Sequence, residues 1–486
     1  MGSDVTTIRT PLVINGEERF TEETFPVADP SQTGAVAGHA SAASAAEARE
    51  AVDAAHTAWP AWAALAPSER VKLTMQALET LDRDVDERTE LLVRENGKVR
   101  FESGIDLHVF ADRFHQAANF APALDRPEQL SGPPFATTID HLPFGVVTII
   151  IPFNWPLAIL AASLPHALMA GNTVVVKPPP TAPLAVVQTL RHVARTLPPG
   201  VLNVVTGSDA VIGSPLVEDP RVKKICFTGS VGGGRRIMTM AATNLTNVTL
   251  ELGGNDPAII LDDAELDEAA FGRLAMGAYL TTGQVCMAMK RLYVPRRRFD
   301  EVVDGLRAAI AGTRVGPGLS PDTTMGPLHT PRQRDFVVEL VEEARAGGSE
   351  ILREGTFVDG VSEQSGNYLL PMIVLEPAPD QRIVTEEQFG PALPVIAYDH
   401  EADAVAQAND TWSGLCSSVW SGDRDHGTAV AAQLRTGATF FNNHNAPAVD
   451  ERAPFGGFNQ SGIGRELGHE GLLAFTETHV VSVPAS

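Results

Sequence analysis

The residues from 144 onward alternate apolar β-branched runs with helical stretches, and this alternation restricts the possible folds more than any other feature. The runs are continuous in apolar residues: FGVVTIII, NTVVVKP, GVLNVVTG, VKKICFTGS and NVTLELGG. Segments with helical spacing, such as 183–197 and 233–243, lie between them. Uninterrupted apolar strands that alternate with helices are typical of a parallel sheet covered on both faces. The sequence therefore predicts an α/β fold.

A second α/β series begins near Asp256. It contains the runs PAIILDD and RLYV and helical patterns over 266–281, 299–312 and 332–347. The first third of the chain instead has a short β-rich entry, followed by helical spacing over 45–62, 68–83 and 84–96. We find no internal repeat and no low-complexity linker. Two interleaved α/β domains fit this order better than two domains in series.

Charge and cysteine content limit the possible partners. The 486 residues carry 37 basic and 60 acidic side chains, a formal net charge of −23. Such a surface repels phosphate backbones and anionic membranes, so we expect no nucleic-acid or membrane partner. The three cysteines form no CxxC pair, which argues against a disulfide framework or a structural zinc site and fits a reducing compartment. The 13 histidines show no ligand spacing, so we expect no metal.

The N-terminus and the longest apolar stretch indicate a cytoplasmic protein. MGSDVTTIRTPLVING lacks the apolar core of a secretory signal. Gly2 and Thr6 fit a loose myristoylation pattern, which arises far more often by chance or cloning. The stretch 157–176 is interrupted by a proline, a histidine, a glycine and an asparagine, so we expect a helix, a turn and a strand there, not a membrane span.

Cys286, in TTGQVCMAMK, is the first candidate catalytic residue. A lone cysteine is more often a buried structural thiol than a nucleophile. Gly283 and Gln284 end the preceding helical pattern just before it, so irregular backbone surrounds the thiol. A helix end or a nearby base can lower a thiol pKa enough to give a reactive thiolate.

Glu251 and Asn154 add two polar groups in unusual places. Glu251 ends an apolar strand in TLELGGND, where a buried carboxylate is costly without a partner or a role, and the two glycines behind it allow close approach to the backbone. The alternative is a solvent-exposed strand end. Asn154 lies between two prolines in PFNWP, so its amide could donate to a developing oxyanion or only satisfy a turn.

A fourth motif, FTGSVGGGRRI, combines a strand, a glycine-rich turn and a helix start. This order places backbone amides where a pyrophosphate could bind. The motif is not GxGxxG and is a weak signal by itself.

Together, these motifs resemble the NAD(P)-dependent aldehyde dehydrogenase superfamily, and the resemblance covers almost the whole chain. Seven blocks occur in the family's order: PFNWP (152–156), VVVKPPPTAPL (174–184), FTGSVGGG (227–234), ELGG (251–254), GQVC (283–286), EEQFGP (386–391) and PFGGFNQSGIGREL (454–467). The resemblance implies a Rossmann-like cofactor-binding domain interleaved with a second α/β catalytic domain and a small β oligomerisation extension.

The resemblance also implies catalytic roles. Cys286 would form a thiohemiacetal and then a thioester, while the Asn154 side chain and the Cys286 amide hold the oxyanion. Glu251 would activate the water that hydrolyses the thioester, and Glu466 in GREL would support proton transfer. Those relatives that pass the acyl group to coenzyme A or phosphate tend to lack the general-base glutamate, so Glu251 favours water as the acceptor.

For the cofactor, NAD or NADP, the resemblance implies a set of contacts along the chain. Lys177 would reach the adenosine ribose, and Glu387 the nicotinamide ribose with Phe389 packed nearby. The turn beside the pyrophosphate would comprise Thr228, Gly229, Ser230 and Gly234. Many NAD-preferring members carry a glutamate where this chain has Pro180, and its loss makes NADP use credible without excluding NAD.

The resemblance further implies domain boundaries and partners. We expect residues 1–122 and 142–251 to form the cofactor-binding domain, 252–457 the catalytic domain, and 123–141 with 476–486 the extension of a homodimer or homotetramer. The loop 442–452 and Met287 would line the entrance for a small aldehyde. Asp450, Glu451 and Arg452 in that loop fit solvated rim charges better than recognition of a polar aldehyde.

Three alternatives remain. The first is an acylating semialdehyde dehydrogenase that uses coenzyme A. The second is a catalytically silent scaffold, which loss of Cys286, Glu251 or Asn154 would have signalled. The third, a cysteine hydrolase that pairs Cys286 with a histidine, explains none of the other blocks.

Overall fold

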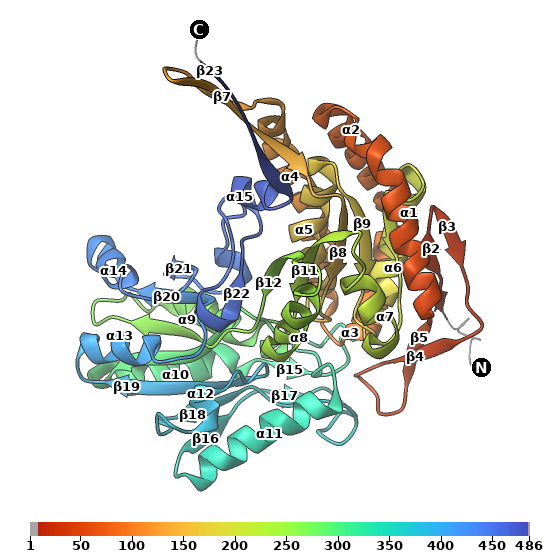
Figure 1. The fold of residues 1–486 in the computed structure, drawn as a ribbon. Helices are drawn as coiled ribbons and strands as arrows, with labels where there is room; N and C mark the ends of the chain where they lie inside the picture. The colour runs from red at the N-terminus through yellow and green to blue at the C-terminus, as the bar shows by residue number, and fades with distance from the viewer. Residues whose placement is uncertain (1–7, 485–486) are drawn as a thin grey trace.

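The computed structural model describes residues 8–484 and builds most of them around two large sheets (Figure 1). The Gly2–Thr6 pattern and residues 485–486 of the expected extension lie outside the described residues. No helix among residues 8–484 is both long and apolar enough to cross a lipid bilayer.

The first sheet has eight strands, and its five central strands are parallel. In spatial order the strands are β22 (Gly462–Ile463), β12 (Asn247–Glu251), β11 (Val222–Thr228), β8 (Val146–Ile150), β9 (Thr173–Lys177), β10 (Leu202–Val204), β2 (Leu12–Ile14) and β3 (Glu17–Arg19). The edge strands β22, β2 and β3 are antiparallel to their neighbours. The five apolar runs of the sequence are these central strands, as predicted.

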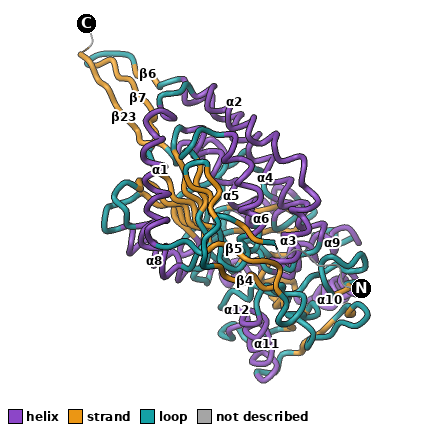
Figure 2. The backbone as a smooth tube through the Cα atoms, turned by 90° about the vertical axis from the view of Figure 1, so that its right-hand side faces the viewer, coloured by secondary structure: helices purple, strands orange, loops and turns teal. Residues whose placement is uncertain are grey.

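Both faces of the first sheet are covered because successive side chains of a strand point to opposite sides. Val174 and Val176 face one apolar core, whereas Val175 faces the other. One face packs against α1 (Ala45–Ala63), α7 (Asp209–Val217) and α8 (Val231–Ala241). The other packs against α2 (Pro67–Leu78), α3 (Val85–Asn96), α4 (Arg100–Phe120), α5 (Pro156–Ala170) and α6 (Leu184–Thr196). Figure 2 shows these strands between the two groups of helices.

The second sheet has seven strands, all parallel except its edge strand β16. In spatial order they are β16 (Glu350–Arg353), β18 (Met372–Leu375), β19 (Ala392–Tyr398), β14 (Met289–Pro295), β13 (Asp256–Ile260), β20 (Cys416–Trp420) and β21 (Ala438–Phe441). One face packs against α9 (Glu268–Tyr279) and α10 (Phe299–Ala311), and the other against α11 (Pro331–Ala346), α12 (Arg382–Thr385), α13 (Glu401–Asn409) and α14 (Arg424–Ala431). The α/β class is thus confirmed.

A third sheet projects from the body of the molecule (Figure 1). It consists of β6 (Glu128–Leu130), β7 (Phe135–Pro143) and β23 (Thr476–Pro484), with β23 antiparallel to β7 along its whole length. These strands fall within the extension expected from the sequence, except that β7 runs past residue 141 to Pro143. The assembly role of the extension stays a prediction. Two minor sheets contain β1 (Arg9–Thr10), β4 (Thr24–Ala28) and β5 (Val36–Ser41), and β15 (Arg314–Val315) with β17 (Thr356–Phe357).

Element boundaries differ from the sequence pattern, as two helices show. The helix expected over 68–83 ends at Leu78 and continues as a 3-10 helix, Glu79–Asp84. The helix expected over 266–281 is α9, which ends at Tyr279 and is followed by a short turn, Leu280–Gly283. After the second sheet the chain returns to the first through β22, which pairs with β12, and then through α15 (Gly468–Leu473) to β23. The domain boundaries stay a prediction.

Candidate active site

A cavity of about 280 Å³ collects most of the predicted site residues. It lies where the carboxyl ends of β8, β11 and β12 meet residues of the second half of the chain. The predicted residues that line it are Cys286, Glu251, Asn154, Thr228, Gly229, Ser230, Glu387 and Phe389. Lys177, Pro180, Gly234 and Glu466 are not among its lining residues.

Asn154 is held in the loop between β8 and α5. Pro156 is the first residue of α5, where a proline costs no helical hydrogen bond. The side chain of Asn154 is buried, and its Nδ2 donates to the carbonyl of Gln284 at 3.0 Å. This bond ties the Asn154 loop to the segment that carries Cys286. An amide nitrogen has two donors, so one remains after this bond.

The backbone before Cys286 is strained, and a buried carboxylate supports it. Thr281 and Thr282 have φ angles of 53° and 57°, which are costly for β-branched residues. The amide of Thr281 donates to Glu102 of α4 at 2.6 Å, and the hydroxyl of Thr282 donates to the Gly326 carbonyl at 2.9 Å. The turn that presents Cys286 thus depends on contacts distant in sequence.

Cys286 is the one partly accessible cysteine of the three, because Cys226 and Cys416 are buried. Burial of its surroundings raises the pKa of the Cys286 thiol to about 12. The charge of Lys290 lowers this pKa, whereas Glu387, Asp256 and Glu251 raise it further. In the free protein the thiol is therefore neutral at physiological pH. The lowered pKa that the sequence made plausible is not found, because desolvation outweighs the nearby cation.

Glu251 is a buried carboxylate at the end of β12, and neither of its oxygens has a hydrogen-bond partner among residues 8–484. Burial and the neighbouring Glu466 raise its pKa well above the ordinary glutamate value, and Arg465 acts against them. Gly253 lets the Glu387 carboxylate approach the backbone, because a Cβ on Gly253 would lie 2.1 Å from Oε2 of Glu387 and would displace it. Two carboxylates thus approach the same backbone turn.

Glu466 lies behind Glu251 and outside the cavity. Its Oε1 accepts a hydrogen bond of 2.6 Å from Ser163 of α5, and burial raises its pKa. Gly456, in the same C-terminal segment, would bring a Cβ within 2.8 Å of Oε1 of Glu251. The segment 454–467 therefore covers the buried side of Glu251.

The glycine-rich turn leads into helix α8. Ser230 caps this helix, and its Oγ accepts a hydrogen bond of 3.1 Å from the Gly233 amide. A Cβ on Gly229 would lie 2.7 Å from the Phe227 ring, and one on Gly234 would lie 2.7 Å from Leu252. Thr228, Gly229 and Ser230 line the cavity, so the N-terminus of α8 adjoins the space that contains Cys286.

Lys177 and Pro180 lie farther along the same sheet edge. Lys177 ends β9 and is buried, and its Nζ forms an ion pair with Asp209, the first residue of α7, at 2.5 Å. Pro180 lines a separate cavity of about 390 Å³ with Thr181 and His329. The sequence motifs did not identify Asp209.

Glu387 and Phe389 follow α12. Glu387 accepts a hydrogen bond of 3.3 Å from the Gly254 amide and lies 3.6 Å from Nζ of Lys290, while burial raises its pKa. Phe389 has a φ angle of 47° and meets Phe153 edge to face at 6.1 Å.

Several site residues were not predicted. Gln333 of α11 lines the cavity, and no local pattern marks it. Phe153 lines it as well and stacks on His329 at 4.0 Å. Lys290 lies in the stretch that drew attention to Cys286, and a lysine within an apolar strand is a signal that could have identified it.

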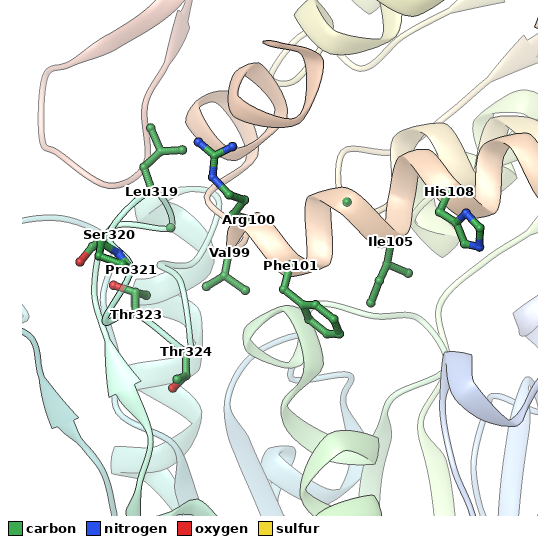
Figure 3. A pocket seen from close by; sticks show the side chains of 12 residues that line it. Val99, Arg100, Phe101, Ile105, His108, Leu319, Ser320, Pro321, Thr323 and Thr324 are labelled. Carbon is green, nitrogen blue, oxygen red and sulfur yellow. The ribbon is translucent and has the colours of Figure 1, made fainter. Parts of the chain in front are cut away.

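A larger cavity of about 910 Å³ lies elsewhere, between the N-terminal half of α4 and the loop 318–324 (Figure 3). Phe101 and Ile105 extend toward it from α4. None of the predicted site residues lines it.

Comparisons with known proteins agree with this geometry. The sequence pattern of the aldehyde dehydrogenase family matches residues 18–481. A geranial dehydrogenase from Castellaniella defragrans is 38% identical over 402 residues, which is 80% of this chain and 81% of that protein.

Solved structures are similar over almost the full length. An NADP-dependent enzyme from E. coli has a TM-score of 0.93 at 31% identity and covers 99% of this chain and 100% of its own. An NAD+ complex of an aldehyde dehydrogenase from Bacillus cereus has a TM-score of 0.92 at 30% identity, with 99% and 97% covered. The chain therefore belongs to the aldehyde dehydrogenase family and is an enzyme of that family.

Proposed function

We propose that the protein oxidises an aldehyde to a carboxylic acid, with NAD(P)+ as electron acceptor and Cys286 as nucleophile. The observation that carries this proposal is the 280 Å³ cavity, which brings together a partly accessible thiol, a side-chain amide and a buried carboxylate that has no hydrogen-bond partner in the described part of the chain. A thiol, a base and an oxyanion donor are the groups that covalent acyl chemistry requires.

In the first step the Cys286 thiol releases its proton to solvent, and the resulting thiolate adds to the aldehyde carbon and forms a C–S bond. The carbonyl oxygen becomes an oxyanion, which the Cys286 amide and the remaining N–H of Asn154 stabilise. The bond from Asn154 to Gln284 orients that donor before substrate binds. Removal of one such donor commonly costs 10²–10³-fold in rate, so about the same loss is expected here.

The residues around the cavity fit a nicotinamide dinucleotide. The α8 N-terminus offers amides to a pyrophosphate, and the crowding at Gly229 shows that a larger residue would disturb this turn. Glu387, with Phe389 beside it, would hold the nicotinamide ribose. When bound there, the oxidised nicotinamide supplies the acceptor for the hydride that leaves the substrate carbon. As the hydride leaves, the electrons of the oxyanion restore the C=O bond, and the substrate is held as a thioester on Cys286.

Glu251 then serves as general base for hydrolysis. It takes a proton from water as the water attacks the thioester carbon; the C–S bond breaks, the acid leaves and the Cys286 thiolate is restored. Glu466, whose negative charge raises the pKa of Glu251, assists the proton transfer from behind. Because Glu251 is present, water is favoured over coenzyme A as the acyl acceptor, and with the thiol and the amide in place a silent scaffold is disfavoured.

Lys177 and its partner Asp209 bear on the cofactor preference. Solved relatives include an NAD+ complex and an NADP-dependent enzyme, so the fold takes either. Pro180 replaces the glutamate that many NAD-preferring relatives carry. A different acid, Asp209, pairs with the Lys177 ammonium and neutralises its charge. An exposed carboxylate at the ribose would repel a 2′-phosphate. We therefore expect NAD to be preferred over NADP.

The substrate is proposed to be a small aldehyde with an apolar chain. Ile159, which lines the cavity, belongs to a small apolar cluster that also contains Trp155, Ile105, Val109, Leu280 and Met287. The charged residues of the loop 442–452 have other partners: Asp450 pairs with Arg452 at 2.7 Å, and Glu451 with Arg113 at 2.9 Å. They act as rim charges and leave an apolar entrance.

The domain and assembly roles also remain proposals. We assign residues 1–122 and 142–251 to the cofactor-binding domain, 252–457 to the catalytic domain, and 123–141 with 476–486 to subunit assembly in a cytoplasmic homo-oligomer. The exposed apolar side chains of the extension support the last assignment.

The test is reduction of NAD+ or NADP+ by purified protein with a panel of aliphatic, aromatic and semialdehyde substrates. Cys286→Ala should abolish turnover. Glu251→Gln should release about one equivalent of reduced cofactor and then stall as a thioester on Cys286, detectable by mass spectrometry. Turnover in Cys286→Ala, or acceleration of wild type only by added coenzyme A, would overturn the proposal in its hydrolytic form.

A further inference from the structure

Lys290 is a buried cation in the centre of the site that the proposed chemistry does not use. It is the second residue of β14, and only 2% of its surface is exposed. Burying an ammonium group is costly unless carbonyls and carboxylates surround it. The groups that surround the Lys290 ammonium therefore indicate the role of this residue.

The ammonium group holds the backbone on both sides of the nucleophile. Nζ donates to the carbonyls of Val285 at 2.7 Å, Cys286 at 3.1 Å and Ala288 at 3.3 Å. These three bonds use the three N–H donors of a lysine. The turn at residues 285–288 is thus wrapped around one positive charge.

The same ammonium group lies beside the cofactor-site carboxylate. Nζ is 3.6 Å from Oε1 of Glu387, whose other contact there is the Gly254 amide. Nζ also lies 6.0 Å from the centre of the Phe389 ring. One side chain therefore contacts both the nucleophile turn and the segment expected to hold the nicotinamide ribose.

We propose that Lys290 is a positioning residue of the active site, which fixes the Cys286 turn, holds Glu387, and stabilises the Cys286 thiolate through its charge. This inference rests on the proposed function of Cys286 and Glu387. It adds a residue and a role that no motif in the sequence assigned.

The effect of each neighbouring charge on the pKa of Cys286 is consistent with a role for Lys290 in stabilising the thiolate. Lys290 lowers the pKa of Cys286, while Glu387, Asp256 and Glu251 raise it. Lys290 also acts on Asp256, whose pKa burial raises to about 8, and on His444, whose pKa burial lowers to about 3. Asp256, Glu387 and the thiol thus share one neighbouring ammonium, and its loss leaves the thiolate less stable.

The test is the rate at which iodoacetamide alkylates Cys286 in the protein without cofactor, followed by peptide mass between about pH 7 and 9.5, where the thiolate fraction sets the rate. Lys290→Gln removes the charge and keeps an amide donor for the carbonyls. We expect its alkylation rate to fall about tenfold at every pH, since a nearby opposite charge shifts a pKa by about one unit or more. Lys290→Arg should stay close to wild type.

A control variant that removes a negative charge distinguishes an effect of the Lys290 charge from a general loosening of the turn at residues 285–288. Glu387→Gln removes a negative charge and should raise the alkylation rate, whereas general loosening would raise it in both neutral variants. Circular dichroism confirms folding. If Lys290→Gln does not fold, Lys290→Met and Lys290→Arg are compared instead, and their difference in rate decides the question.

Kinetics provide a second readout. With NAD+ and an aldehyde, Lys290→Gln should lower kcat and raise the KM for NAD+ by several-fold, and Lys290→Arg should restore both. Equal alkylation rates in wild type and Lys290→Gln would overturn the proposal. Because alkylation needs neither aldehyde nor cofactor, that result is distinct from failure of the proposed function, which an absence of cofactor reduction by wild type would reveal.

Discussion

At the scale of single residues, the site depends on ionisable groups whose burial opposes the charge that catalysis needs. Both the thiol of Cys286 and the carboxyl of Glu251 have raised pKa values, and burial is the largest cause in each. Below its raised pKa, Glu251 is protonated and cannot accept a proton from water. If Glu251 is the general base that we propose, activity rises as pH rises through the pKa of Glu251.

The first prediction concerns this pH dependence. We expect kcat to increase from about pH 6 to 9, because the carboxylate fraction of Glu251 and the thiolate fraction of Cys286 both grow with pH. In Glu251→Gln, which stalls after one turnover, the rate of that single burst should keep only the rise due to the Cys286 thiol. A kcat of wild type that is flat over this range would contradict the assignment. The measurement is steady-state turnover with saturating cofactor and aldehyde.

The second prediction concerns Asp209. Replacement of Asp209 by Asn removes the negative charge beside Lys177 and leaves the ammonium free to attract a phosphate. We expect kcat/KM for NADP+ to rise about tenfold relative to that for NAD+. Asp219→Asn, which changes a carboxylate paired with Arg221 beyond the end of α7, is the matched control. An unchanged ratio would show that Asp209 does not set the preference.

At the scale of elements, the helices around the cofactor side are secured by side chains from other helices. Helix α6 has no side-chain cap of its own at Pro183. Instead, Glu95 of α3, which is fully buried, accepts hydrogen bonds of 2.7 Å from the amides of Leu184 and Ala185. One carboxyl group thereby satisfies two amides at a helix start.

The third prediction is that Glu95→Ala destabilises the fold by about 2–4 kcal/mol, because two buried amides lose their acceptor. Thermal unfolding followed by circular dichroism measures this loss. Glu87→Ala, at an exposed position of the same helix, should change stability by less than about 0.5 kcal/mol. Equal effects of the two substitutions would exclude the capping role.

At the scale of the whole molecule, the projecting sheet would leave apolar surface exposed to water in a monomer. Several of its large apolar side chains are exposed: Leu130, Phe135, Leu142, Val480, Val481 and Val483. A patch of this kind on a protruding sheet indicates a protein interface. We infer that a second copy of the chain covers it.

The fourth prediction is that Val481→Asp shifts the assembly toward monomer, as sedimentation velocity would detect. Val36→Asp, at a similarly exposed valine of β5, is the control and should leave the assembly unchanged. If Val481→Asp sediments like wild type, this sheet does not hold the subunits together. Alkylation of Cys286 should be similar in both variants, because the cavity lies within one chain.

Much of the fold and part of the site were predictable. The apolar runs predicted the central parallel strands because burial on both faces requires continuous apolar residues. Cys286, Glu251 and Asn154 could be identified because each is a reactive or polar residue in an unusual place. Cys286 follows a helix end, Glu251 ends an apolar strand, and Asn154 lies between two prolines. The expected end of the helix over 68–83 was wrong, because α2 ends at Leu78 and continues as a 3-10 helix.

The sequence by itself determined the α/β class, the family resemblance and the candidate nucleophile, since these depend on local periodicity and short motifs. Only the tertiary structure decided that Lys290 faces both Cys286 and Glu387, that Asp209 neutralises Lys177, and that burial keeps the thiol neutral. The physical reason is that pairing and desolvation act between residues distant in sequence. Such groups meet only when the carboxyl ends of the first sheet's strands are brought against the segments that lead into β14 and β19.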